Sequence, residues 1–331
     1  MTTQDYQHER DIAVAAVREA ARLCQAVQAQ IDPGIIEKKD RSPVTVADFG
    51  SQALVCRMLR KAFPDDPIIA EEDATSLRQA DQTAVREQVA RHVQALRPDA
   101  VPEAILNWID YGNAEAYSDR FWTLDPIDGT KGFLRGQQYA VALALIVEGQ
   151  VQVAALACPN LPARLGESGG AAGSIYTAIR GRGALRLSLN GGGEAEGVHV
   201  SVLEGAAQAR FCESVEAGHS SHSDAAAVAE RLRITAAPAR LDSQAKYAVV
   251  ARGDADIYLR LPTRPGYVEK IWDHAAGMLV VTEAGGAVTD VAGAPLEFHH
   301  GPRLQNNRGV VVTNGPLHAD VLAALEAVGV G

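Results

Sequence analysis

The segment at residues 122–133 constrains this chain most, because it joins an apolar strand to two acids three residues apart. The strand-like run ends at Asp125, a proline follows, and a tight turn would point Asp125 and Asp128 at one place. Gly129 permits an unusual backbone angle, and Thr130 would begin a short helix whose free amides face an anion. Two carboxylates beside such a helix start suit magnesium together with a phosphate. The same residues also compose plain turns, so a turn without chemistry is the alternative reading of this segment alone.

Three further acids lie at comparable positions in other segments. Glu71 opens an acidic triplet directly after the apolar run Ile68–Ala70, and Asp273 stands at the start of a helix-like pattern. Asp48 follows Thr45, which we expect to cap a helix that runs to residue 62. Each acid has an ordinary alternative: a solvated acidic loop for Glu71, a helix N-cap for Asp273, and a first-turn acid that satisfies the helix dipole for Asp48.

The remaining pattern predicts helices and strands in two domains. Apolar residues recur at helical spacing over 8–30, a short strand is expected at 35–41, and strands at 139–147 and 151–157 flank a hairpin turn. Beyond the glycine-rich stretch 191–197, strands alternate with helices, as they do in α/β domains. We therefore expect an N-terminal α+β domain over residues 1–195 and a C-terminal α/β domain over 196–331. Residues 73–120 are interpreted as an insertion that covers one edge of the site.

Charge and composition narrow the class of protein. The chain has 331 residues and a formal net charge of −10, which disfavours nucleic acid and anionic membranes as partners. The longest apolar run, Ala140–Val147, is too short to span a bilayer, and the N-terminus lacks the basic-then-apolar pattern of a signal peptide. The four cysteines form no C-x-x-C pair, so we expect free thiols in a soluble cytoplasmic protein.

Four segments together resemble the lithium-sensitive, magnesium-dependent phosphatase superfamily that includes inositol monophosphatase and fructose-1,6-bisphosphatase. They are Pro43–Asp48, Ala70–Asp73, Asp125–Thr130 and Trp272–Gly277, in this order along the chain. One departure is Ala70, where glycine is common in the superfamily. The resemblance implies a layered α-β-α-β-α sandwich, with an antiparallel sheet and most metal ligands in the N-terminal domain and a more parallel sheet in the C-terminal one.

Within the superfamily the chain is most similar to the 3'(2'),5'-bisphosphate nucleotidases, which remove the 3'-phosphate of adenosine 3',5'-bisphosphate. The similarity is carried by Thr130–Phe133, Val215–His222, Leu241–Tyr247 and Tyr258–Pro262. It implies a small nucleotide bisphosphate as substrate, with the sulfated analogue 3'-phosphoadenylyl sulfate as a second one. Two alternatives stay open: an inositol phosphate phosphatase of the same superfamily, and a phosphate- or nucleotide-binding regulator without catalytic activity.

The resemblance also implies a set of metal ligands. One magnesium ion would be held by Glu71, Asp125 and the backbone carbonyl of Ile127. A second would be held by Asp125, Asp128 and Asp273, and a third, weaker ion would lie near Glu71. Sodium or lithium would compete for the second position.

The remaining roles concern the attacking water and the substrate. By the same resemblance, the Thr130 hydroxyl, hydrogen-bonded to Asp48, would orient the water and relay its proton. The residues expected to contact the substrate are Gly129, Thr130, His219, Ser243, Lys246 and Arg260. For His219 the alternative is an ordinary histidine in a polar loop.

Overall fold

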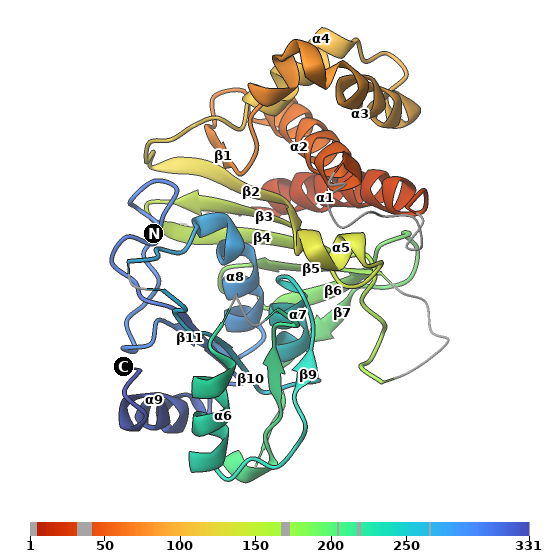
Figure 1. Cartoon of the computed structure of the whole chain (residues 1–331). Coiled ribbons are helices and arrows are strands. Elements are labelled where there is room, and N and C mark those ends of the chain that lie inside the picture. The colour runs from red at the N-terminus through yellow and green to blue at the C-terminus, as the bar shows by residue number, and fades with distance from the viewer. Residues whose placement is uncertain are drawn as a thin grey trace.

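The structure is a computed structural model that describes residues 5–31, 42–166, 173–203, 205–216, 220–264 and 266–330. Its elements form five layers, α-β-α-β-α (Figure 1), which confirms the expected layered fold. Helices α1 and α2 cover a seven-stranded sheet, α7 and α8 lie between it and a five-stranded sheet, and α6 and α9 cover the far face of the latter. Within the described ranges, no helix combines the length and the apolar character that crossing a membrane requires.

The first layer pairs two long helices, α1 (Gln7–Gln28) and α2 (Ser42–Ala62). The expected cap at Thr45 is wrong, because α2 begins three residues earlier and Thr45 lies inside its first turn. A proline at the second helical position permits this start, since amides of the first turn need no partner within the helix. The short strand expected at 35–41 lies outside the described residues.

The seven-stranded sheet follows the order of the chain from β1 to β7. Only its first pairing, β1 with β2, is parallel; the others are antiparallel. The turn between β3 and β4 has positive φ angles at Glu148 and Gly149, as a two-residue hairpin requires. The strands are β1 (Ile68–Ala70), β2 (Arg120–Asp128), β3 (Ala140–Val147), β4 (Gln150–Cys158), β5 (Ser174–Ile179), β6 (Ala184–Ser188) and β7 (Glu196–Val198). Because β7 pairs with β6, the two sheets separate after Val198, three residues beyond the expected domain boundary, and the division into domains stays a prediction.

The second sheet has the order β11-β12-β10-β8-β9 and is mixed. Two of its pairings are parallel and two are antiparallel, so it is more parallel than the first sheet. Its strands are β8 (Phe211–Glu213), β9 (Ala239–Arg240), β10 (Ile257–Arg260), β11 (Ala287–Thr289) and β12 (Val310–Thr313). The helices around it are α6 (His222–Arg231), α7 (Ala245–Ala251), α8 (Ala275–Glu283) and α9 (His318–Ala327).

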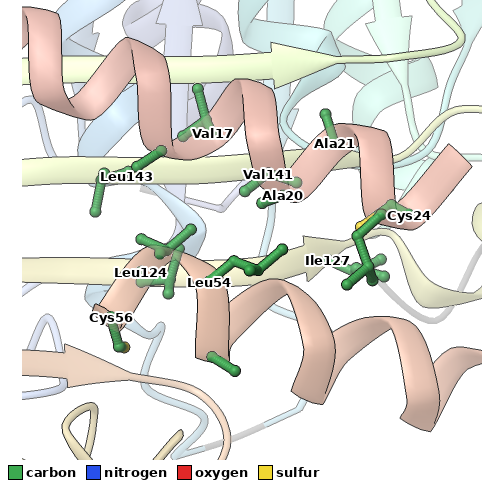
Figure 2. Close-up of a cluster of buried hydrophobic side chains, with 14 of the residues drawn as sticks. Val17, Ala20, Ala21, Cys24, Leu54, Cys56, Leu124, Ile127, Val141 and Leu143 are labelled. Atoms are coloured by element: carbon green, nitrogen blue, oxygen red, sulfur yellow. The ribbon is translucent and has the colours of Figure 1, made fainter. Parts of the chain in front are cut away.

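Three apolar cores separate the layers, because alternate residues of a strand face opposite sides of a sheet. In the first core, side chains of α1 and α2 such as Val17 and Leu54 meet Leu124, Ile127 and Leu143 of the sheet (Figure 2). The cysteines, as expected, are buried free thiols.

The segment expected to cover one edge of the site lies elsewhere. Its helices, α3 (Thr83–Leu96) and α4 (Pro102–Asp110), pack on α2 at the outer end of the molecule (Figure 1). Val89 and Ile109 join the first core there. The segment therefore thickens the first helical layer.

Candidate functional site

Two parallel strands bring the first pair of acids together. In the register of β1 with β2, Ala70 lies opposite Leu124, so Glu71 and Asp125 follow at the same edge of the sheet. The pairing of β2 with β3 then shifts register between Asp125 and Asp128. Such an irregularity re-aims side chains, and here it turns a second carboxylate toward the first.

Helix α2 holds both of these strand ends by hydrogen bonds. The buried Ser51 hydroxyl donates to the Pro126 carbonyl at 2.9 Å. The Gln52 side chain accepts from the Glu72 amide at 3.1 Å and donates to the Glu72 carbonyl. The side chain of Ile127 packs into the first core (Figure 2), and its neighbour Asp128 lines the cavity instead.

These strand ends open into a cavity of about 350 Å³ between the two halves of the chain. It is lined by Glu71, Asp125, Ile127, Asp128, Gly129, Thr130, Lys131, Leu134, Asp242, Ser243, Gln244, Lys246, Tyr258, Arg260, Asp273 and His274. All predicted site residues are among them except two. Asp48 is buried and does not line the cavity, and His219 lies outside the described residues. The lining includes nothing from residues 74–120.

Besides Asp242, four acids line this cavity, and we call them the acid cage: Glu71, Asp125, Asp128 and Asp273. Burial, together with the charges of Glu71 and Asp128, holds the pKa of Asp125 well above its usual range. Burial and the neighbouring Asp128 raise the pKa of Asp273 to about 7. Burial, Glu72 and Asp128 raise the pKa of Glu71 to about 7. The cage therefore concentrates negative charge, which Lys270 near Glu71 and His274 and Arg260 near Asp273 offset only in part.

One atom of the cage shows what it could hold. Asp125 Oδ1 is buried and has no hydrogen-bond partner. An ionised oxygen left in this way is costly unless a cation binds it. Hard carboxylate oxygens from separated segments, with a backbone carbonyl nearby, are the ligands that magnesium prefers. The donor set thus fits divalent cations.

The part of the cavity lining that carries Arg260 and Lys246, which we call the basic wall, is paired with other groups of the protein. Arg260 donates to Glu269 at 3.2 Å, and Glu269 also contacts His274 Nε2 at 3.3 Å. The other ring nitrogen of His274 meets the Tyr247 hydroxyl at 2.7 Å. Burial opposes ionisation of Glu269, but His274 and Arg260 outweigh it and lower the pKa of this carboxyl to about 2. Both nitrogens of His274 are engaged, so this residue braces Arg260 rather than offering a metal ligand.

Lys246 is the second cation of this wall. Its side chain is buried, and its Nζ donates to the carbonyls of Ser243 at 2.8 Å and Leu241 at 3.3 Å. The same ammonium lies 5.1 Å from the centre of the Tyr258 ring. Lys246 therefore stabilises the loop that carries Ser243, whose φ of 68° is unusual for a residue with a side chain.

A glutamine that no sequence pattern marked joins cage and wall. The Gln244 amide donates to Asp128 Oδ2 at 2.6 Å. Its side chain donates to the Trp272 carbonyl at 2.8 Å and accepts from the Gly277 amide at 3.2 Å. Gln244 thus connects Asp128 with the segment that carries Asp273. The one available signal was its place beside Ser243, within a segment already matched to the phosphatases.

The structure does not join Thr130 to Asp48. Thr130 begins α5 (Thr130–Leu134) after Gly129, is exposed, and makes no hydrogen bond with Asp48. Burial and the charges of Glu72 and Glu71 hold the pKa of Asp48 well above its usual range, so Asp48 lies close behind the cage. The relay between these two residues stays a prediction.

Comparison with known proteins places this geometry among characterised enzymes. The model of the inositol monophosphatase family matches residues 1–329. A 3'(2'),5'-bisphosphate nucleotidase of Emericella nidulans is 46% identical, with 98% of this chain and 99% of that protein covered. One from Schizosaccharomyces pombe is 45% identical, with 97% and 95% covered.

Solved structures show the same fold at lower identity. The inositol monophosphatase of Anabaena (Nostoc) sp. PCC 7120 superposes with a TM-score of 0.63 at 23% identity, covering 99% of this chain and 98% of that one. An inositol monophosphatase of Thermotoga maritima gives 0.63 at 22% identity, with 96% of each chain covered.

Proposed function

The chain belongs to the inositol monophosphatase family, and we propose that it is a magnesium-dependent 3'(2'),5'-bisphosphate nucleotidase. It would hydrolyse the 3'-phosphate of adenosine 3',5'-bisphosphate, giving AMP and phosphate, and would also accept 3'-phosphoadenylyl sulfate. The observation that carries the proposal is the lining of one cavity, which combines the acid cage with two cations, the buried Lys246 and Arg260, whose side chain is 17% exposed. Relatives at 45% identity or above over nearly the whole chain carry the nucleotidase name.

The cage residues would hold the metal. Glu71, Asp125 and the Ile127 carbonyl would bind one magnesium ion, and Asp125, Asp128 and Asp273 a second, with a weaker third ion near Glu71. When bound, these ions supply charge neutralisation for the phosphate and lower the pKa of a water molecule. The unpartnered Asp125 Oδ1 supports this assignment.

The remaining residues orient the reactants. The Thr130 hydroxyl, at the exposed start of α5, would position the attacking water, and Asp48 behind the cage would accept its proton. Ser243 and Gly129 lie side by side in the cavity lining and would contact the nucleoside together. Since Arg260 is fixed by Glu269, it would meet the 5'-phosphate without further ordering. His219 is proposed as a nucleoside contact from sequence similarity alone.

The test is phosphate release from adenosine 3',5'-bisphosphate, inositol 1-phosphate and fructose 1,6-bisphosphate. Each substrate is offered with magnesium, with a chelator, and with magnesium plus lithium. We expect fast release from the nucleotide, none with chelator, and inhibition by lithium. D125N removes a cage charge, and D73N changes an exposed acid two residues from Glu71 that lies outside the cavity. D73N should retain full activity.

The other outcomes are informative. Faster release from inositol 1-phosphate would keep the cage assignment and refute the nucleotide assignment. Binding of nucleotide and magnesium without turnover of any substrate would make the chain a binding protein.

A further inference from the structure

The short helix α5 meets the loop at residues 242–244 along a contact that the mechanism above does not use. The Gln244 amide donates to Asp128 at 2.6 Å. At the next position the two backbones approach so closely that a Cβ on Gly129 would lie 2.8 Å from the Cβ of Ser243. We call the contact between residues 128–135 and 242–244 the α5 seam.

The seam continues along α5 in the same way. A Cβ on Gly132 would lie 2.8 Å from a carboxylate oxygen of Asp242, so only glycine fits there without displacing that side chain. Along the seam, successive residues of one segment meet preceding residues of the other. The two segments therefore run in opposite directions along this contact.

Arg135 closes the outer end of the seam. It donates to Asp242 at 2.5 Å and to Glu216 at 2.7 Å, and Lys131 donates to the other oxygen of Glu216 at 2.8 Å. The Asp242 side chain is 5% exposed, whereas that of Glu216 is 25% exposed. Asp242 is thus the desolvated partner, and the loss of Arg135, whose own side chain is 35% exposed, would leave a buried carboxylate without its partner.

The seam joins the two sides of the cavity. Asp128 belongs to the acid cage, on the strand end of the first sheet, and Ser243 lies on the loop that Lys246 holds. A substrate with phosphates on both the 3' and the 5' position of one ribose must meet both groups of residues at once. A misplacement of about 1 Å can cost on the order of a hundredfold in rate. A small phosphomonoester occupies the cage alone and is indifferent to that spacing.

We propose that Arg135 is a positioning residue for hydrolysis of the two-phosphate substrate: through Asp242 it fixes the spacing between the acid cage and the loop that carries Ser243. This inference rests on the proposed nucleotidase function. Its signature is a selective loss, large for the substrate that spans the cavity and small for one that does not.

The experiment compares kcat and KM of R135M, R135K and E216Q for adenosine 3',5'-bisphosphate and for phenyl phosphate. R135M should lower kcat/KM for the nucleotide about a hundredfold, mainly through KM, and that for phenyl phosphate less than about threefold. R135K should regain at least about tenfold, since one ammonium can still pair with Asp242. E216Q should cost about threefold, because its pairs are partly solvated. E216Q leaves the pair of Arg135 with Asp242 intact. If R135M does not fold, R135K and E216Q can still be compared for the two substrates.

A matched control is R252M. Arg252 pairs with Asp254 at 2.8 Å, both side chains are 7% exposed, and neither residue belongs to the seam. This variant should lose stability, but its kcat/KM should change by the same factor for both substrates. A similar loss for both substrates in R135M, or no loss for either, would overturn the proposal. Wild-type protein that releases phosphate from inositol 1-phosphate but not from the nucleotide would refute the proposed function itself, before any variant is made.

Discussion

Two parts of one cavity lining carry opposite charges, and they differ in how far neighbouring groups of the protein satisfy them. On the basic side, Arg260 and Lys246 are held by a carboxylate and by backbone carbonyls. On the acidic side, burial together with the charges of Glu71 and Asp128 raises the pKa of Asp125, and one oxygen of Asp125 has no hydrogen-bond partner. The basic wall therefore finds its partners within the protein, and the contrast supports the proposal that the acid cage binds cations from solution.

The largest effect is expected for D125N, which removes one carboxylate of the acid cage. We expect activity to fall about a thousandfold, because several kcal/mol of charge stabilisation would be lost with the metal. In chelator, however, the variant should unfold at a higher temperature than wild type, since a charge is removed from a like-charged cluster. Phosphate release and thermal unfolding in chelator measure both effects. A lower unfolding temperature would mean that the cage is compensated in a way the structure does not show.

R260M, on the basic side, should lower the stability of the protein, whereas D125N should raise it in chelator. Glu269 would then be a buried carboxylate that keeps His274 but loses Arg260, at a cost of about 3–5 kcal/mol in the free energy of unfolding. The KM for the nucleotide should also rise. R186M, which breaks an exposed pair with Glu196, should cost at most about 1 kcal/mol. Denaturant unfolding measures the free energy of unfolding of R260M and R186M. Equal losses would contradict the view that the pair of Arg260 with Glu269 is the more important one.

The two sides should also respond to pH in opposite directions. In metal-free protein the pKa values of Glu71 and Asp273 are raised to about 7, so the folded state binds these protons more tightly than the unfolded state. This part of the stability should therefore increase as pH falls from 8 toward 5. The pKa of Glu269 is lowered to about 2, so its contribution is present above the unfolded pKa and disappears only as pH falls toward 2. Thermal unfolding at several pH values, in chelator and again with excess magnesium, separates the contribution of the cage acids from that of Glu269.

Magnesium provides the check on this assignment. Ions that occupy the cage need the carboxylates ionised, so apparent affinity should fall by about tenfold per pH unit for each displaced proton below pH 7. Calorimetric titration at pH 8, 7 and 6 measures it. An affinity that does not change with pH would place the ion elsewhere.

The smallest effect is expected where a hydrogen bond between uncharged groups is removed. S51A removes the buried hydrogen bond to the Pro126 carbonyl and should cost about 1 kcal/mol in stability. Its matched counterpart is S220A, because the Ser220 hydroxyl donates to the Leu259 carbonyl at 3.0 Å and is equally buried. Only S51A should also weaken magnesium binding. Equal magnesium affinities would show that the turn holds its shape without α2.

The contrast also shows what the sequence could reveal. Asp125 and Asp128 were predictable because strand, turn and helix start are adjacent in the chain, and Glu71 because an apolar run precedes it. The bracing of Arg260 was not, since Glu269, His274 and Tyr247 meet only after two helices pack between the sheets. Their partners depend on tertiary contacts that no local pattern specifies.

Errors of detail have the same origin. Thr45 has the composition of a helix cap, but nothing local signals that α2 starts three residues earlier. Residues 74–120 were placed over the site from their position after Glu71, whereas the apolar faces of α3 and α4 find their partner on α2. Their packing, unlike the cage, had no pattern in the sequence to locate it.

The middle helical layer has a consequence for how such a chain can evolve. Helix α8 is apolar on nearly every side and packs so closely on α7 that a Cβ on Gly277 would lie 2.3 Å from the Tyr247 ring. Both sheets use this layer as the wall of one shared core. A gene fusion that exchanged either half for an unrelated domain would leave one face of these helices in water. Inheritance of the two halves as a single unit is therefore the expected pattern, and variation should accumulate instead in the outer layers.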